Sequence, residues 1–213
     1  MPTVTMTDPP YSIPELATGR LQLRAWRLEE ASVMRQLADD REVAATTLSL
    51  THPYPLTAAT GFIASHAMSA DRGDSLVWAL APRDSDPIGN ISLALSLAHE
   101  RAEIGYWLGR AYWGDGYMTE AARAVVDYAF RVLRLRRVNG HAMARNIASC
   151  RVMEKSGMRR EGVLRQHIRR WTEFEDIVAY GVLREDWEPC TALHVEGSGM
   201  GAAIDDDGKA EAR

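Results

Sequence analysis

The chain has 213 residues, of which 46% are hydrophobic, and it carries a formal net charge of −4 and two cysteines. This length and apolar content suit one domain with a packed core, whereas the acidic balance argues against general nucleic-acid binding and two cysteines cannot form a disulfide framework. No apolar stretch approaches the roughly 20 residues of a membrane helix and no secretory leader is apparent, so we expect a soluble, cytoplasmic protein without membrane contact.

The predicted elements lie between two irregular ends. Residues 1–14 contain four prolines and residues 191–213 lack aromatic side chains, so we expect an irregular arm, a domain at 15–190 and a disordered tail. Periodicity and turn residues predict, in chain order, a strand at 20–26, helices at 28–38 and 57–72, strands at 76–81, 88–97 and 103–108, a helix at 119–133, a strand at 137–143, a helix at 147–156 and an arginine-rich hairpin ending near residue 187.

This order of elements indicates the α/β (α+β) class. A central mixed, twisted sheet with helices on both faces is the simplest arrangement that buries the apolar stripes of the predicted helices. Thr57 and Thr119 are the expected N-terminal caps of their helices.

A glycine loop at 112–120 lies between a predicted strand and a predicted helix. The first amides of a helix lack intrahelical partners and the helix dipole adds positive charge, so the backbone there can hold a phosphate. Gly114 and Gly116 would let the backbone approach a ligand closely. The alternative is a tight turn before a helix, and the pattern is neither a P-loop nor a full dinucleotide fingerprint.

Two longer motifs resemble the Rim-type (RimJ/RimL-like) branch of the GNAT superfamily of N-acetyltransferases. The first is AEIGYWL at 102–108 followed by YWGxGYxTEA at 112–121, and the second is NxASxRVxEKxGMxxEG at 146–162 followed by DxVxY at 176–180. The match runs from about residue 20 to about residue 187. It implies a single GNAT-like domain with a mostly antiparallel sheet, in which strands 103–108 and 137–143 form a parallel pair that splays apart at the cofactor site.

The resemblance also implies acetyl-CoA as the co-substrate, and nothing in the sequence suggests a metal. The residues that it assigns to the cofactor are Trp113, Gly114, Asp115, Gly116, Tyr117, Met118 and Thr119 at the pyrophosphate, and Trp107, Leu108 and Asn146 at the pantetheine arm. Met118 departs from the usual glycine or alanine, and its side chain could crowd the phosphate. The tyrosine that often acts as the acid in the superfamily is replaced by Met153.

Two residues are candidates for catalysis. Ser149 resembles the serine that Rim-type enzymes use as general acid, although helix packing is an equal alternative. For the base, Glu103 leads narrowly over the three carboxylates of 173–176, and a structural pairing with an arginine is its alternative. His141 is predicted to point to the same face of the strand 137–143 as Asn139 and could relay a proton, although a lone histidine there can also be purely structural.

The leading interpretation is acetyl transfer to a protein N-terminal α-amine by direct attack in a ternary complex. An α-amine with a reference pKa of about 8 is far more often neutral at pH 7 than a lysine at about 10.4, so it needs only a modest base. The alternatives are a small-molecule amine, such as a polyamine or an antibiotic, and a non-catalytic acyl-CoA-binding regulatory module. Acidic residues around the acceptor site, expected within 42–72, would favour a polyamine.

Partners other than the acceptor are less defined. Residues 131–170 carry twelve Lys and Arg against two acids, a local balance of +10. This segment could face the polyanionic cofactor or ribosomal RNA, or it could cover apolar surface with arginine stems. Ribosome association therefore stays open. A homodimer is a separate possibility that the sequence does not decide.

Overall fold

The computed structural model of the chain describes residues 13–189 and 194–196. Its strands are β1 (Glu15–Ala17), β2 (Leu21–Arg24), β3 (Ser75–Pro82), β4 (Gly89–Ser96), β5 (Arg101–Leu108), β6 (Arg137–Met143), β7 (Arg159–Arg170), β8 (Glu173–Leu183) and β9 (His194–Glu196). Its helices are α1 (Ala31–Ala38), α2 (Arg41–Ala45), α3 (Leu56–Asp71), α4 (Tyr117–Arg131) and α5 (Ile147–Lys155), with four short 3-10 turns between elements.

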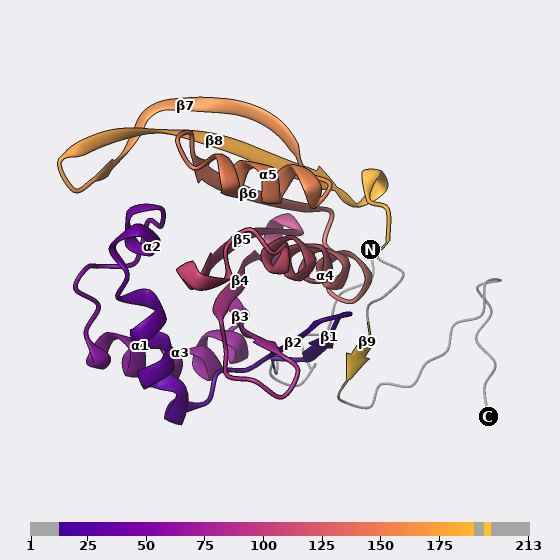
Figure 1. Cartoon of the computed structure of the whole chain (residues 1–213). Coiled ribbons are helices and arrows are strands. Elements are labelled where there is room, and N and C mark those ends of the chain that lie inside the picture. Colours follow the sequence, from indigo (N-terminus) through magenta and orange to yellow (C-terminus); the bar gives the residue numbers. More distant parts are fainter. Residues whose placement is uncertain (1–12, 190–193, 197–213) are drawn as a thin grey trace, which may run out of the picture.

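All nine strands belong to one sheet in the order β7-β8-β6-β5-β4-β3-β2-β1-β9. Neighbouring strands are antiparallel except β5 and β6, which run parallel. The sheet twists strongly along this order (Figure 1). The predicted mixed, mostly antiparallel sheet is therefore confirmed.

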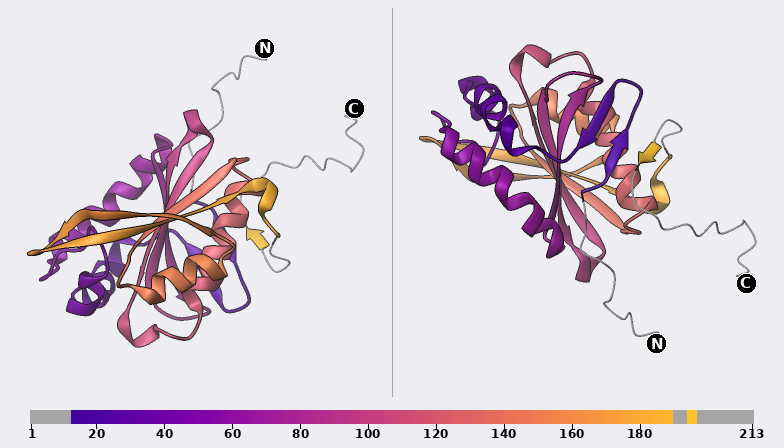
Figure 2. Two further views of the ribbon diagram at one scale, coloured as in Figure 1. Left: turned by 90° about the horizontal axis from the view of Figure 1, so that it is seen from above. Right: turned by 90° about the horizontal axis from the view of Figure 1, so that it is seen from below.

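Helices cover both faces of the sheet, as predicted (Figure 2). α4 and α5 pack on one face around Val125 and Met153, and this larger core contains Trp78, whose side chain is fully buried. α1, α2 and α3 pack on the other face in a second core that includes Met34 and Trp107. No helix in the described part of the chain is long and apolar enough to cross a membrane.

Three short elements were not predicted. α2 follows α1 closely, and β1 pairs with β2 on one side and with β9 on the other. β9 lies in the range 191–213, for which we expected disorder; three residues are too few to show a period, and backbone pairing needs none. The rest of that range and residues 1–12 lie outside the described residues.

Two helix caps differ from the prediction. α3 begins at Leu56 after Pro55, whose extended backbone precedes the helix, so Thr57 is already helical. α4 begins at Tyr117 because Gly116 takes a left-handed conformation with φ of 79° and acts as the N-cap. Thr119 therefore lies in the first turn of α4 and is not its cap.

The parallel strands β5 and β6 separate halfway along their length. Their pairing runs from Arg101 opposite Arg137 to Ile104 opposite Gly140. Beyond that point β5 stays paired with β4, and β6 stays paired with β8. The edges of β5 and β6 that face each other are thus unpaired past Ile104 and Gly140, and the splay that the resemblance implied is present.

Candidate active site

A cavity of about 450 Å³ opens where β5 and β6 separate. Its walls are the second half of β5, the end of β6, the glycine loop with the first turn of α4, much of α5, and the loop 46–49 that follows α2. Every predicted site residue lines this cavity except Asp115. The loop 46–49 falls within the range expected to cover the acceptor.

The glycine loop takes the shape that its two glycines allow. Gly114 and Gly116 have φ of 92° and 79°, values that other residues adopt only with strain. The first intrahelical hydrogen bond of α4 runs from the amide of Glu120 to the carbonyl of Gly116. The amides of the first turn of α4 therefore have no acceptor within the helix and can bind an anion.

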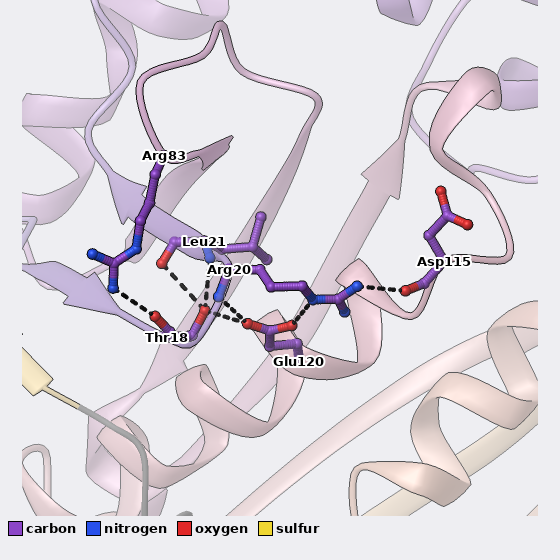
Figure 3. Close-up of polar contacts among 6 residues, drawn as sticks. All are labelled: Thr18, Arg20, Leu21, Arg83, Asp115 and Glu120. Carbon is purple, nitrogen blue, oxygen red and sulfur yellow. Dashed lines mark hydrogen bonds and ion pairs between the residues drawn. The ribbon is translucent and has the colours of Figure 1, made fainter.

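The loop is fastened to the turn between β1 and β2 (Figure 3). Glu120 accepts from Thr18 Oγ1 at 2.6 Å, from the Arg20 amide at 2.8 Å and from Arg20 Nε at 2.7 Å. Arg20 Nη1 also donates to the carbonyl of Asp115 at 2.9 Å. Burial alone would raise the pKa of Glu120, but the hydrogen bonds from Thr18 and Arg20 outweigh it and hold the pKa below its ordinary value.

Asp115 lies outside the cavity, and Met118 lines it with a side chain that is largely buried. Asp115 is tied to Arg20 through its carbonyl and does not line the cavity. The side chain of Met118 is only 6% exposed and packs in the core beneath α4, because the second residue of a helix that starts at Tyr117 turns inward. The Met118 side chain is thus directed mainly into the core and does not project from the glycine loop into solvent.

The pantetheine candidates are partly used within the chain. Trp113 Nε1 donates to the carbonyl of Leu108 at 2.8 Å, which holds the loop against the end of β5. Asn146 is the N-cap of α5, and its Oδ1 accepts from the Ser149 amide at 3.1 Å. Both side chains still line the cavity.

Glu103 and His141 form a pair on one wall. His141 Nδ1 lies 2.9 Å from Glu103 Oε1, and the two side chains are 30% and 49% exposed. The expected alternative partner, an arginine, is not what Glu103 contacts. Of the competing carboxylates, Glu175 is paired with Arg145 and none of the three lines the cavity.

Ser149 forms a second pair with a residue that the sequence analysis missed. The Tyr106 hydroxyl lies 2.9 Å from Ser149 Oγ and 3.2 Å from the Ser149 carbonyl oxygen. Burial raises the pKa of the Tyr106 phenol far above its ordinary value, so it stays protonated. Strand alternation could have placed Tyr106 on the face of Ile104, but nothing in the sequence indicated Ser149 as its partner.

The two pairs approach the cavity from opposite faces of the sheet. In β5, Glu103 alternates with Ile104, and Ile104 and Tyr106 pack toward the core beneath α4 and α5. Glu103 is therefore on the face covered by α1, α2 and α3, where Trp107 is buried. This arrangement can accept a proton on one side of the opening between β5 and β6 and donate one on the other.

The family profile described as an acetyltransferase (GNAT) domain matches residues 20–159, most of the described chain. With the splayed strand pair and the glycine loop before α4, this match defines the class: the chain belongs to the GNAT acetyltransferases, enzymes that take an acetyl group from acetyl-CoA. The GNAT superfamily, which the two sequence motifs indicated, is thus confirmed, and the Rim-type branch stays a prediction.

Individual relatives place the chain among N-acetyltransferases. "Probable N-acetyltransferase YjcK" of Bacillus subtilis is 42% identical over 107 residues, which cover 49% of this chain and 59% of YjcK. "Uncharacterized N-acetyltransferase p20" of Bacillus licheniformis is 28% identical over 174 residues, 81% of this chain and 97% of p20. The ribosomal protein uS5-alanine N-acetyltransferase of Escherichia coli is 26% identical over 110 residues, 51% of this chain and 57% of that protein.

Among solved structures, Mycobacterium smegmatis RimJ in complex with CoA-disulfide has the same fold. It superposes with a TM-score of 0.72 at 21% identity over 81% of this chain and 87% of RimJ. The chain aligns with less than two thirds of the length of YjcK and of the uS5-alanine enzyme.

Proposed function

We propose that this protein transfers the acetyl group of acetyl-CoA to the α-amine of a protein N-terminus by direct attack. The observation that carries this proposal is the cavity between β5 and β6, with the Glu103 and His141 pair on one face and Ser149 on the other. The similarity to the ribosomal protein uS5-alanine N-acetyltransferase, whose acceptor is a protein, supports the acceptor class.

The residues present fit acetyl-CoA. The free amides at the start of α4 suit its pyrophosphate, and the unpaired edges of β5 and β6 suit the amides of its pantetheine arm. Arg151 and Lys155 also line the cavity and add positive charge for a ligand with several phosphates. When bound, this co-substrate supplies the acetyl group and a thiolate leaving group.

In the proposed reaction the two pairs handle the protons. As the amine nitrogen bonds to the acetyl carbon, the Glu103 and His141 pair takes the proton that nitrogen loses; with Nδ1 directed at Glu103, Nε2 is the ring nitrogen left to accept it. As the carbon–sulfur bond breaks with its electrons on sulfur, Ser149 Oγ gives sulfur a proton. The Glu103 and His141 pair then releases the amine proton to water, and Ser149 regains one proton from water. One proton thus moves from amine to thiol in net terms.

The walls of the cavity favour an acceptor with a single amine. Glu103 is the only carboxylate among the described residues that line it, whereas a polyamine carries several positive charges that call for several acids. The loop 46–49 instead presents Thr46, Thr47 and Ser49, and the hydroxyls of Thr46 and Thr47 donate to carbonyls of α2. The oxygens of these two hydroxyls can still accept, and such neutral groups suit the amides of a peptide at a chain end.

Four of the eleven arginines in 131–170 form ion pairs within the described part of the chain. The pairs are Arg131 with Asp127, Arg137 with Glu161, Arg145 with Glu175 and Arg159 with Asp186. The proposal therefore does not require this basic segment to bind ribosomal RNA, and association with ribosomes would be a separate property.

The test is release of free CoA thiol over a panel of amines. We expect turnover with peptides that have a free α-amine, and none with the same peptides blocked at that amine, with spermidine or with aminoglycosides. Ser149→Ala should lower kcat about 100-fold while the Kd for CoA holds, and Glu103→Gln should lower it similarly. Glu173→Gln, an exposed carboxylate away from the cavity, is the matched control.

Other outcomes have defined meanings. Turnover of spermidine or an aminoglycoside alone would replace the peptide acceptor with a small molecule. CoA binding without thiol release from any amine would favour a regulatory module that binds acyl-CoA.

A further inference from the structure

Tyr106 occupies a fixed position beside the proposed acid. Its ring packs against the core beneath α4 and α5, and its hydroxyl reaches Ser149 at the cavity wall. Ser149 is held from its other side, because its amide donates to the Asn146 cap. The separation of the two hydroxyl oxygens is thus set by a strand and a capped helix, both of which are packed in place.

The number of protons restricts how these hydroxyls can bond. A phenol and a seryl hydroxyl each carry one proton and can each also accept one. If Tyr106 donates to Ser149 Oγ at 2.9 Å, the seryl proton must point elsewhere and is free to point into the cavity. The Ser149 carbonyl oxygen is the other acceptor within reach of the Tyr106 hydroxyl, at the longer distance of 3.2 Å. It lies within α5, where one of its two lone pairs serves the helix.

We propose that Tyr106 is a positioning residue for Ser149: by donating to Ser149 Oγ, it directs the seryl O–H at the sulfur of the acetyl donor. This inference rests on the proposed function, in which Ser149 gives sulfur a proton as the carbon–sulfur bond breaks. Tyr106 keeps its own proton throughout, so no covalent bond forms or breaks at it. Its raised pKa is consistent with a lasting donor.

A second tyrosine that contacts α5, the buried Tyr180, separates positioning from simple anchoring. The Tyr180 hydroxyl, from β8, donates to Glu154 Oε1 of α5 at 3.1 Å. Tyr106 and Tyr180 therefore both fasten α5 to the sheet through one hydroxyl, but Tyr180 does not line the cavity. Tyr106→Phe and Tyr180→Phe each remove one hydroxyl that contacts α5 from the sheet. Only Tyr106→Phe should change the hydrogen bond that Ser149 donates to the sulfur.

The first experiment needs no acceptor. The pKa of the CoA thiol is measured in the complex by the ultraviolet absorbance of the thiolate, with the desulfo-CoA complex subtracted so that tyrosine signals cancel. A hydrogen bond donated to the thiolate lowers the thiol pKa. We expect Ser149→Ala to raise it by about one unit, Tyr106→Phe to raise it by a smaller amount, and Tyr180→Phe to leave it unchanged.

Each outcome of the titration has one reading. A thiol pKa that rises in Ser149→Ala but not in Tyr106→Phe overturns the role of Tyr106 and leaves that of Ser149 intact. A thiol pKa that neither variant moves overturns both roles. Equal shifts in Tyr106→Phe and Tyr180→Phe would mean that Tyr106 only anchors α5. The acceptor is tested separately by thiol release, so its failure does not alter these readings.

The second experiment is a double-mutant comparison with an acceptor. We expect Tyr106→Phe to lower kcat about tenfold with little change in the KM for acetyl-CoA, and to have no further effect in the Ser149→Ala protein. If the two losses multiply, Tyr106 acts independently of Ser149 and the inference fails.

Discussion

His66 in α3 is a buried histidine that takes no part in the proposed chemistry. Its side chain is 4% exposed, and neither ring nitrogen has a hydrogen-bond partner within the described part of the chain. The ring of Phe62 packs edge-on against the imidazole, with 4.4 Å between the two ring centres. Burial lowers the pKa of His66 to about 4. The neutral ring is therefore the form that the fold accepts.

This placement predicts a dependence of stability on pH. Between pH 6.5, the ordinary histidine pKa, and about pH 4, the unfolded chain binds the proton and the folded chain does not, so acidification favours unfolding. The wild type should lose about 3 kcal/mol more of its unfolding free energy from pH 7 to pH 4 than His66→Leu does. Urea unfolding at both pH values measures this, with His99→Leu as an exposed control; equal losses in wild type and His66→Leu would contradict the prediction.

At the scale of single residues, sequence predicted which side chains gather but not all of their partners. Motif spacing placed Ser149, Glu103 and the glycine loop at one cavity, since their elements follow in a fixed order. The roles of Tyr106 and Arg20 were missed because they depend on partners distant in the sequence. Ser149 lies 43 residues after Tyr106, and Glu120 lies 100 residues after Arg20, so no local pattern indicates either contact.

At the scale of elements, the long strands and helices were predicted because they carry an apolar period. β1, α2 and β9 have three to five residues, fewer than a period needs to be visible. β1 nevertheless matters to the site, since the turn after it supplies Thr18 and Arg20 to the loop. The start of α4 was placed two residues late because its N-cap is Gly116 and not Thr119.

The link between that turn and the glycine loop gives an element-scale prediction. Arg20 joins Glu120 to the Asp115 carbonyl and lies 4.5 Å from the centre of the Tyr117 ring. Arg20→Met should weaken CoA binding about fivefold, equivalent to about 1 kcal/mol, because the loop would no longer be held in its binding shape. Isothermal titration calorimetry with CoA measures the change.

The control for this prediction is Arg72→Met. Arg72 forms a comparable exposed ion pair with Asp74, remote from the loop. If both variants bind CoA as tightly as the wild type, the contacts of Arg20 with the glycine loop have no role in binding. If Arg20→Met and Arg72→Met lower the stability and the CoA affinity by equal amounts, the effect of Arg20 is not specific to the loop.

At the scale of the whole molecule, the hairpin of β7 and β8 reaches across to α2 and to Leu50, on the proposed acceptor side of the cavity. Arg170 Nη2, at the end of β7, donates to the carbonyl of Ala44 and, at 2.5 Å, to that of Leu50. Arg145, which follows β6, adds a bond from its Nη2 to the carbonyl of Ala45 at 2.7 Å. These bonds flank the loop 46–49, which lines the cavity. Two distant parts of the chain thus shape one wall.

The bonds from Arg170 hold the loop 46–49 and do not contact the glycine loop. Replacing Arg170 should therefore weaken binding of the acceptor and leave binding of CoA unchanged. Arg170→Met should raise the KM for the acceptor peptide about tenfold, leave the Kd for CoA within twofold, and speed amide hydrogen exchange in residues 44–50. Arg169→Met, which removes the neighbouring exposed arginine over Phe174, should change none of these. Equal losses of CoA and acceptor affinity, without faster local exchange, would show that the hairpin stabilises the whole fold and does not shape the acceptor wall in particular.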